Sequence, residues 1–394
     1  MVNINRRTGA ELYIHIPFCI RKCEYCDFLS FAADEETVHR YIRALQKEIA
    51  IRADSIGHKK VISVYFGGGT PSSISADYIS DIMDTVRFYY DLTDDAEITI
   101  EVNPGTVSTD KFKIYHACGI NRVSIGLQST DDDLLARLGR IHTYDEFLEC
   151  YKMARKCGFT NINVDLMSAI PGQSLTDWGR SLDKVIELKP EHISAYSLII
   201  EEGTPFYDRY GEDNARREHG EDPYLLADEE SERMMYYMTI QNLCSAGYEN
   251  YEISNFAKPG YESRHNTGYW IRREYLGMGL GAASLVMDSR FSNTRDINEY
   301  MEMLECGKQR FEDIQHLDRK DKMEEFMFLG LRMTRGISRS DFEEEFEMPI
   351  ESIYGDALNK LSNAGLIMMV EDRIFLTSEG VDVSNYVLSE FLID

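Results

Sequence analysis

Three cysteines near the start of the chain are the residues best suited to chemistry. The stretch Cys19-Ile-Arg-Lys-Cys23-Glu-Tyr-Cys26 places three thiols in one short loop, and thiolates select iron-sulfur clusters or zinc. A ferredoxin-like carrier or a structural zinc site needs a fourth ligand, which residues 27–30 do not supply. His15 is the alternative zinc ligand, but it lies within a predicted strand and faces away from the thiols. The loop therefore predicts a [4Fe-4S] cluster with one open iron.

A glycine-rich turn follows the second predicted strand. Gly67, Gly68 and Gly69 precede Thr70 and Pro71, and consecutive glycines let backbone amides approach a ligand without obstruction by Cβ atoms. Such turns also occur without a ligand. Joined to the cysteine loop, this turn predicts backbone that lines a ligand site beside the thiols.

Polar side chains recur at one level of the predicted sheet. Glu101 ends the third strand, Gln128 ends the fourth, and Asp165 lies in the fifth. Burying such groups unpaired costs about 1–3 kcal/mol each, so they predict either ribose and adenine partners or internal pairing. Arg140 is expected to pair with a ligand carboxylate or with a neighbouring acid.

These residues require a scaffold in which strands and helices alternate. Short β-rich apolar runs predict strands over residues 12–18, 61–66, 97–102, 122–127, 161–166 and 192–200. Helix-period stretches between them predict helices over residues 36–56, 75–89, 109–118, 144–156 and 175–188. Six such units predict an α/β fold built as a partial (β/α)6 barrel, with its site at the carboxyl edge of the strands.

The alternation of strands and helices stops after residue 201, so the rest of the chain is expected to form parts other than the barrel. We expect the barrel over residues 1–210, an extension over 211–300 and a small α+β C-terminal domain over 301–394, with a strand pair near 366–376. Residues 211–223 read as a hydrophilic loop before a helix over 228–246.

Composition excludes several classes of partner. Lys and Arg number 42 against 68 Asp and Glu, for a net charge of −26, which disfavours nucleic acid. No stretch reaches the roughly 18 apolar residues of a membrane span, and the polar N-terminus lacks a signal-type core. We expect a cytoplasmic protein. The remaining cysteines are expected to be buried small apolar residues: Cys118, Cys150, Cys157, Cys244 and Cys306.

The spacing Cys-x3-Cys-x2-Cys after a first strand, with the glycine turn after the second, resembles the radical S-adenosylmethionine superfamily. That resemblance implies that the open iron binds the amino and carboxylate groups of S-adenosylmethionine. It also implies that an electron from the cluster, delivered by a reducing partner, splits this ligand into methionine and a 5′-deoxyadenosyl radical.

More of the chain is similar to the oxygen-independent coproporphyrinogen III oxidase family. The matching stretches begin at Tyr13, Tyr65, Glu101, Val123, Asp165 and His192. The resemblance implies that Tyr13 contacts S-adenosylmethionine near the cluster and that Tyr25 lies by the adenine. It further implies a first nucleotide site completed by Gly68, Glu101, Gln128, Arg140 and Asp165, and a second involving Gly69, Thr70 and Ile199.

Two departures from the oxidase pattern favour a different subfamily. The oxidase motif has a fourth cysteine where this chain has Phe28, and the oxidase's longer N-terminal segment before the first strand is missing. Both features resemble the HemW haem chaperones. So does the stretch from His265 to Trp270, whose imidazole and aromatic rings suit haem ligation and haem packing, although a histidine beside aromatics is commonly a packed residue.

These resemblances imply two functions, and they leave enzymatic activity open. The first is a haem chaperone that carries haem, a [4Fe-4S] cluster and S-adenosylmethionine and passes haem to haem-receiving apoproteins. The second is a radical enzyme, either the coproporphyrinogen oxidase or a related methyl transferase. A purely structural or electron-carrying iron-sulfur protein fits the cysteines but not the polar residues at the strand ends.

Overall fold

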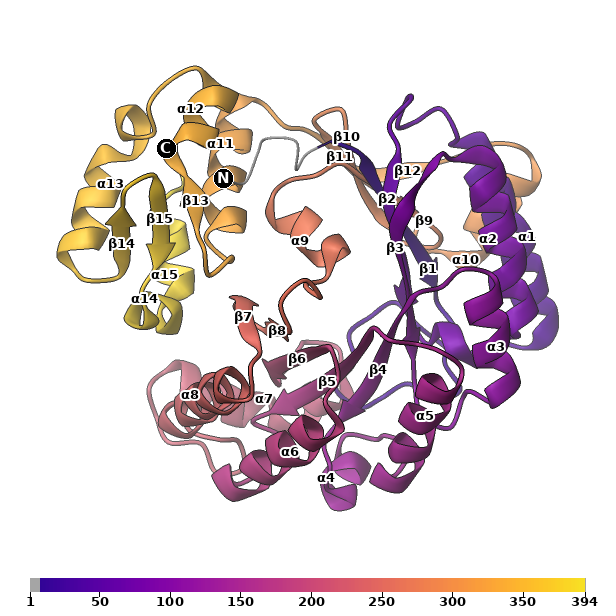
Figure 1. Ribbon diagram of the computed structural model, residues 1–394, viewed down its shortest axis with the longest axis horizontal. Coiled ribbons are helices and arrows are strands. Elements are labelled where there is room, and N and C mark those ends of the chain that lie inside the picture. Colours follow the sequence, from indigo (N-terminus) through magenta and orange to yellow (C-terminus); the bar gives the residue numbers. More distant parts are fainter. Residues whose placement is uncertain (1–7, 394) are drawn as a thin grey trace.

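The computed structural model describes residues 8–393, and six parallel strands form its centre (Figure 1). They pair in chain order, each with the next. The strands are β1 (Ala10–Ile16), β2 (Val61–Gly68), β3 (Leu92–Val102), β4 (Arg122–Gln128), β5 (Ile162–Ser168) and β6 (His192–Ser197). Each overlaps its predicted range, so the predicted partial (β/α)6 barrel is confirmed.

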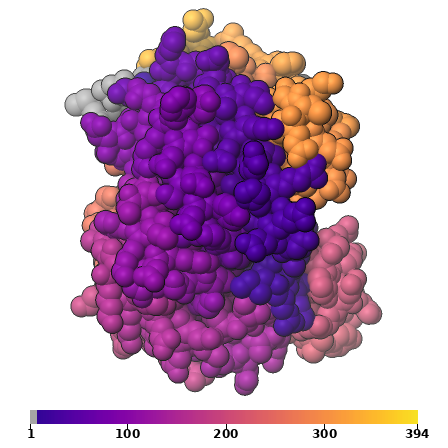
Figure 2. Space-filling model, turned by 90° about the vertical axis from the view of Figure 1, so that its right-hand side faces the viewer, coloured from indigo at the N-terminus to yellow at the C-terminus, as the bar shows by residue number. Residues whose placement is uncertain are grey.

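Helices connect the strands and cover the outer face of the curved sheet (Figure 1). They are α1 (Glu35–Ile51), α2 (Ala76–Tyr89), α3 (Thr109–Ala117), α4 (Asp132–Arg137), α5 (Tyr144–Lys156) and α6 (Leu175–Leu188). Side-chain caps fix where they start: Asp34 accepts from the Thr37 amide before α1, and Thr143 and Glu146 form a capping box at α5. Figure 2 shows that the N-terminal part of the chain, in indigo to magenta, covers most of one side of the molecule.

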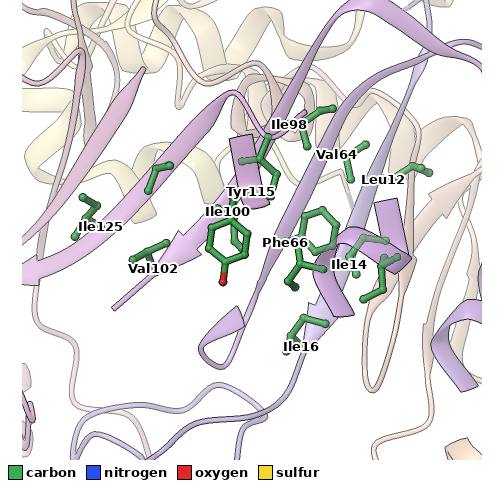
Figure 3. Close-up of a cluster of buried hydrophobic side chains, with 14 of the residues drawn as sticks. Leu12, Ile14, Ile16, Val64, Phe66, Ile98, Ile100, Val102, Tyr115 and Ile125 are labelled. Atoms are coloured by element: carbon green, nitrogen blue, oxygen red, sulfur yellow. The ribbon is translucent and has the colours of Figure 1, made fainter. Parts of the chain in front are cut away.

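The two faces of each central strand have different roles. Alternate residues on β1 to β4 are apolar and fully buried against the outer helices, as Figure 3 shows for Leu12, Ile14, Val64 and Phe66. The residues between them point into the barrel and are mostly polar or aromatic. Because strand side chains alternate in direction, the core lies outside the sheet and a polar space is left inside it.

Further strands extend the sheet at both edges, so one 12-stranded sheet is formed. Beyond β6 lie β7 (Glu249–Glu252) and β8 (Asn255–Ala257); beyond β1 lie β9 (Tyr275–Met278), β10 (Ala283–Val286), β11 (Ser289–Asn293) and β12 (Phe311–His316). Helix α9 (Arg264–Trp270) lies on the inner side of the curve (Figure 1), and α10 (Ile297–Glu305) packs on α1. The proposed division at residue 210 stays a prediction.

The predicted loop over residues 211–223 is wrong in its first half, because α7 (Pro205–Glu218) continues to Glu218. Thr204 caps this helix and proline occupies its first turn. Only Phe206, Tyr210 and Asp213 are buried along it, so its mostly charged surface hid the helical period. The predicted helix over 228–246 is observed as α8 (Glu229–Ser245).

The C-terminal part has its own hydrophobic core, from Met323 to Phe391. Its elements are α11 (Arg319–Gly330), β13 (Ile337–Ser338), α12 (Arg339–Phe346), α13 (Glu351–Asn363), β14 (Ile367–Val370), β15 (Arg373–Leu376), α14 (Ser378–Asp382) and α15 (Ser384–Ser389). β14 and β15 are the predicted strand pair, in an antiparallel three-stranded sheet with β13. Arg272 joins this part to the barrel through ion pairs with Glu325 and Glu345.

The scattered cysteines differ from one another. Cys118 and Cys150 are buried as predicted, but Cys244 and Cys306 are exposed and Cys157 is half-buried. Cys306 directly follows α10 and Cys244 lies near the end of α8, where the helix surface meets solvent, so burial of all five was a wrong expectation. Within residues 8–393 no helix is both long and apolar enough to cross a membrane.

Candidate functional site

A cavity of about 530 Å³ opens into the barrel and gathers most of the predicted site residues. It is bounded at one end by the cysteine loop and along its walls by β2 to β6. Its lining includes every predicted site residue except Tyr13 and His265, namely Cys19, Cys23, Tyr25, Cys26, Gly68, Gly69, Thr70, Glu101, Gln128, Arg140, Asp165 and Ile199.

The cysteine loop is held at both ends by backbone hydrogen bonds. The Cys19 amide donates to the Phe31 carbonyl at 3.0 Å, and the Phe31 amide donates to the Pro17 carbonyl at 2.9 Å. The three thiols between these ties are half-buried, carry no disulfide and line the cavity. Three thiols in one cavity fit a [4Fe-4S] cluster with one open iron. Among the described residues, no three His, Cys, Asp or Glu side chains converge as they would around one metal ion.

His15 supports the loop from the inside of the barrel. Its Nε2 lies 3.0 Å from the Leu29 carbonyl oxygen, and its Nδ1 lies 3.0 Å from the Tyr13 hydroxyl. Burial holds the pKa of His15 below its usual value, so the ring is neutral. Both nitrogens are engaged, which leaves His15 no nitrogen for a zinc site with the thiols.

The glycine turn brings the second strand against the start of the cysteine loop. Gly68 has a φ of 108°, in the region that favours glycine, and a Cβ there would meet the His15 ring. A Cβ on Gly69 would lie 2.8 Å from the Phe18 carbonyl oxygen. The Thr70 hydroxyl lies 3.3 Å from the Cys19 Sγ. Only glycine therefore lets this backbone line the cavity so close to the cluster loop.

Arg140 reaches the same end of the cavity from the segment after α4. Its Nη2 donates to the Asn103 Oδ1 at 2.8 Å and to the Gly126 carbonyl at 2.6 Å, while Nη1 lies 3.7 Å from the Cys23 Sγ. Asn103 in turn donates to Thr70 at 2.9 Å. The guanidinium is thus fixed by the protein, with a positive charge beside one of the three sulfurs.

Two carboxyl groups lie in the cavity wall. The Tyr65 hydroxyl donates to Glu101 Oε1 at 2.9 Å, and Asn163 donates to Asp165 Oδ1 at 2.7 Å. Burial raises the pKa of Glu101 to about 7 and raises the pKa of Asp165. Each carboxyl keeps lone pairs that suit ligand hydroxyl donors.

Gln128 ends β4 in a strained conformation, with a φ of 73°, which is rare for a residue with a side chain. Its Oε1 accepts from the Tyr196 hydroxyl at 3.0 Å. At the mouth of the cavity, Ile199 and Phe28 are 65% and 68% exposed. The position where the oxidase motif has a cysteine thus carries an exposed ring at the opening.

Sequence reasoning missed a set of polar residues deeper in the cavity: Arg122, Ser124, Asn163, Ser194, Asn255 and Asn266. Their signal was present in the sequence. Polar residues alternate with apolar ones along β4, β5 and β6, and a polar face on a strand that is buried on its other side indicates an internal cavity.

Tyr13 and His265 lie behind the cavity wall. Tyr13 stacks on Tyr65, with ring centroids 6.3 Å apart, and Tyr65 faces the cavity. The Nδ1 of His265 lies 2.9 Å from the Ser63 hydroxyl, and its Nε2 lies 2.9 Å from the Tyr269 hydroxyl. Burial lowers the pKa of His265 to about 3. Its ring is neutral, buried and engaged at both nitrogens.

Comparisons with known proteins agree with this geometry. Residues 13–185 match the model of the radical SAM superfamily, and residues 317–383 match the HemN C-terminal domain. The structure of coproporphyrinogen III oxidase (HemN) from Escherichia coli superposes with a TM-score of 0.83 at 24% identity, over 98% of this chain and 91% of that chain. The fold and the cysteine cavity together define a radical SAM protein.

Similar proteins identify the family within this class to which the chain belongs. The chain is 35% identical to the haem chaperone HemW of Bacillus subtilis, over 96% of this chain and 98% of that protein. It is also 35% identical to the haem chaperone HemW of Escherichia coli, over 98% of both chains. The chain belongs to the HemW haem chaperone family.

Proposed function

We propose that this chain binds haem and delivers it to haem proteins, and that Cys19, Cys23 and Cys26 hold a [4Fe-4S] cluster whose open iron binds S-adenosylmethionine. The observation that carries the proposal is the cavity, which joins the three thiols to Glu101 and Asp165 inside one barrel. That cavity occurs in a chain of the haem chaperone family.

The residues present fit the nucleotide ligand. A reduced cluster supplies an electron to a sulfonium ligand on its open iron. The backbone of Gly68 and Gly69 lines the space beside the thiols, and Arg140 adds a fixed positive charge for a carboxylate. Glu101 and Asp165 offer acceptors for hydroxyl groups. A second nucleotide at Gly69, Thr70 and Ile199 remains part of the proposal.

His265 is the residue that would ligate the haem iron. Because Ser63 and Tyr269 occupy its two nitrogens, iron ligation replaces one of these hydrogen bonds. Nε2 is the better candidate, since rotation of the Tyr269 side chain alone would free it, whereas Nδ1 leaves Ser63 only when α9 separates from β2. Because His265 is buried, haem binding at this position also requires a local movement of α9.

Haem titration of the purified protein tests this assignment. Wild type is expected to shift the Soret band at one haem per chain, and His265→Ala is expected to lose most of this binding. Tyr269→Phe frees Nε2 and is expected to retain or strengthen it. His39→Ala, which removes an exposed histidine on α1, serves as the control. Equal haem affinity in wild type and His265→Ala would remove His265 as the ligand.

The second candidate function is a radical reaction on a porphyrinogen, favoured by the fold shared with the oxidase. Anaerobic assay with a reductant and S-adenosylmethionine separates the two functions. A chaperone leaves coproporphyrinogen III unchanged, whereas many turnovers per chain would establish the enzyme instead.

The proposed partners are haem, haem-receiving apoproteins and a donor of electrons to the cluster. The proposed location is the cytoplasm. Support comes from the cysteines, which are all free thiols in the described residues, as a reducing compartment maintains them.

A further inference from the structure

The guanidinium of Arg122 lies deep in the cavity, and no group within residues 8–393 forms a hydrogen bond or an ion pair with it. Arg122 begins β4 and Gln128 ends it, and both line the cavity, which therefore follows this strand for roughly 20 Å. The side chain of Arg122 is only 2% exposed. It forms no hydrogen bond and no ion pair with residues 8–393, and its Nε is buried without an acceptor.

An isolated buried guanidinium is strongly unfavourable. Arginine stays protonated in proteins, so it cannot relieve the cost by losing its charge. Burial of a charge is tolerated when an opposite charge and hydrogen-bond acceptors accompany it. The protein supplies neither to Arg122 at contact distance, so the missing partner is expected to enter with a ligand.

Two acids that line the same cavity have other partners. Glu101 accepts from Tyr65 at 2.9 Å, and Asp165 accepts from Asn163 at 2.7 Å. Burial raises the pKa of both carboxyl groups, which disfavours their charged forms. Where the two acids are ionised, their charges oppose the binding of a further anion. The positive charge of Arg122 lowers the pKa of both carboxyl groups. It acts at a distance, because Arg122 donates a hydrogen bond to neither carboxyl group.

Arg140 provides the internal comparison. It is a second arginine that lines the cavity, half-buried, and its Nη2 donates to Asn103 and to the Gly126 carbonyl. A second unpartnered group accompanies Arg122: the Oδ1 of Asn255 is buried, lacks a hydrogen bond and belongs to a residue that lines the cavity. Asn266 of α9 lines it as well. The unpartnered groups of the cavity are thus a cationic donor, the Arg122 guanidinium, which suits an anionic group, and an acceptor, the Asn255 Oδ1, which suits a donor of the ligand.

We propose that Arg122 binds a carboxylate of a ligand that reaches the deep end of the cavity. The planar guanidinium matches a carboxylate in a two-pronged hydrogen bond. Two ligands of the proposed function carry this group. The methionine carboxylate of S-adenosylmethionine is already assigned to the open iron beside Arg140, at the other end of the cavity, so a propionate of haem is the expected partner and the nucleotide is an outcome of the test. This choice of ligands rests on the proposed function.

Paired ligands distinguish the two sources. Haem is compared with haem dimethyl ester, and S-adenosylmethionine with decarboxylated S-adenosylmethionine, which keeps the sulfonium and the amino group and lacks the carboxylate. The reconstituted full chain is titrated as wild type, Arg122→Gln and Arg122→Lys. Arg21→Gln is the matched control, since it removes one positive charge from the exposed mouth of the same cavity.

Arg122→Gln is expected to weaken one carboxylate-bearing ligand about 10-fold or more and to leave its carboxylate-free counterpart unchanged. Arg122→Lys keeps the charge but loses the two-pronged geometry, so it is expected to show a smaller loss. Loss confined to haem assigns a propionate, and loss confined to S-adenosylmethionine assigns the methionine carboxylate.

Unchanged affinity for both carboxylate-bearing ligands in Arg122→Gln overturns the inference while leaving the proposed function intact. Failure of wild type to bind haem overturns the proposed function, and the nucleotide pair still decides the role of Arg122. If Arg122→Gln does not fold, wild type itself decides: equal affinity for the two members of each pair contradicts a carboxylate site.

Discussion

The cysteine loop and helix α9 lie at different parts of one barrel and treat their polar groups in opposite ways. In the loop, three thiols face the cavity while the backbone ties at Cys19 and Phe31 hold the chain in place. In α9, the ring of His265 is bonded at both nitrogens and its amide donates to Glu97 at 3.2 Å. The thiols of the cysteine loop therefore face the cavity, whereas both nitrogens of His265 are already bonded to protein groups.

A residue can therefore belong to a specific motif without having a side chain that is available to bind a ligand. The thiols became a site because the loop is anchored by its backbone. Thr70 and Arg140 lie beside two of the sulfurs, and a thiolate that ligates iron can still accept from both. His265 belongs to an equally specific motif, yet its side chain fastens α9 to β2 through Ser63. Haem ligation at His265 must therefore exchange existing hydrogen bonds, whereas cluster ligation by the cysteines does not.

The largest expected effect is loss of the cluster at the cysteine loop. Cys23→Ser is expected to abolish nearly all bound iron and sulfide after anaerobic reconstitution, because each thiol supplies one ligand. Its thermal unfolding is expected to match wild type closely, since the loop is held by backbone hydrogen bonds. Cys244→Ser, at an exposed cysteine, is the control. Full cluster content in Cys23→Ser would contradict the three-thiol site.

The next largest effect is expected on the stability of the fold at α9. Gly268 of α9 packs against the Glu11 carboxylate, which is fully buried and paired with Arg273 at 2.7 Å. Gly268→Ala places a methyl group on this carboxylate and is expected to destabilise the fold by about 1–3 kcal/mol, measured by denaturant unfolding.

Gly355→Ala is the matched control, since Gly355 is a helical glycine in α13 with nothing within 4 Å of the added Cβ. It is expected to stabilise the chain by about 0.5–1 kcal/mol. If both alanines have the same effect, the tight contact between α9 and Glu11 is not a feature of the folded protein.

A smaller effect is expected in the cavity wall. Burial raises the pKa of Glu101 from 4.5 to about 7, so the folded chain holds this proton where the unfolded chain has released it. As the pH rises from 4.5 to 7, the free energy of unfolding of wild type is therefore expected to fall by about 1–3 kcal/mol relative to that of Glu101→Gln. Groups that do not interact with Glu101 contribute equally to both proteins and cancel in this difference. A pH-independent difference between the two proteins would contradict the raised pKa.

The sequence was sufficient for the barrel, because β-rich runs alternate with helix-period stretches and each run also carries the turn signals that bound it. It also located the cavity residues on the strand ends, such as Glu101 and Gln128, because parallel strands end at one edge of the sheet. Helix α7 was missed because its few buried residues are separated by charged ones, so the apolar period was weak.

The state of each polar group was beyond local sequence patterns. His265 is engaged by Ser63, 202 positions earlier in the chain, and no local rule predicts so distant a partner. Arg122 was overlooked because a charged residue that begins a strand is usually exposed. Its burial follows from α9 and the extra strands at the sheet edges, which the alternation of strands and helices did not predict.

Haem transfer measured with and without the cluster tests the central claim most directly. The haem-loaded wild-type protein, with its cluster and S-adenosylmethionine, is mixed with an apo haem protein such as apomyoglobin, and the acceptor's Soret band is followed beside the cluster-free Cys23→Ser variant. The account predicts that wild type passes its haem to the acceptor and leaves coproporphyrinogen III unconverted. A wild-type protein that binds no haem, or that binds it and never releases it to the acceptor, would contradict the account.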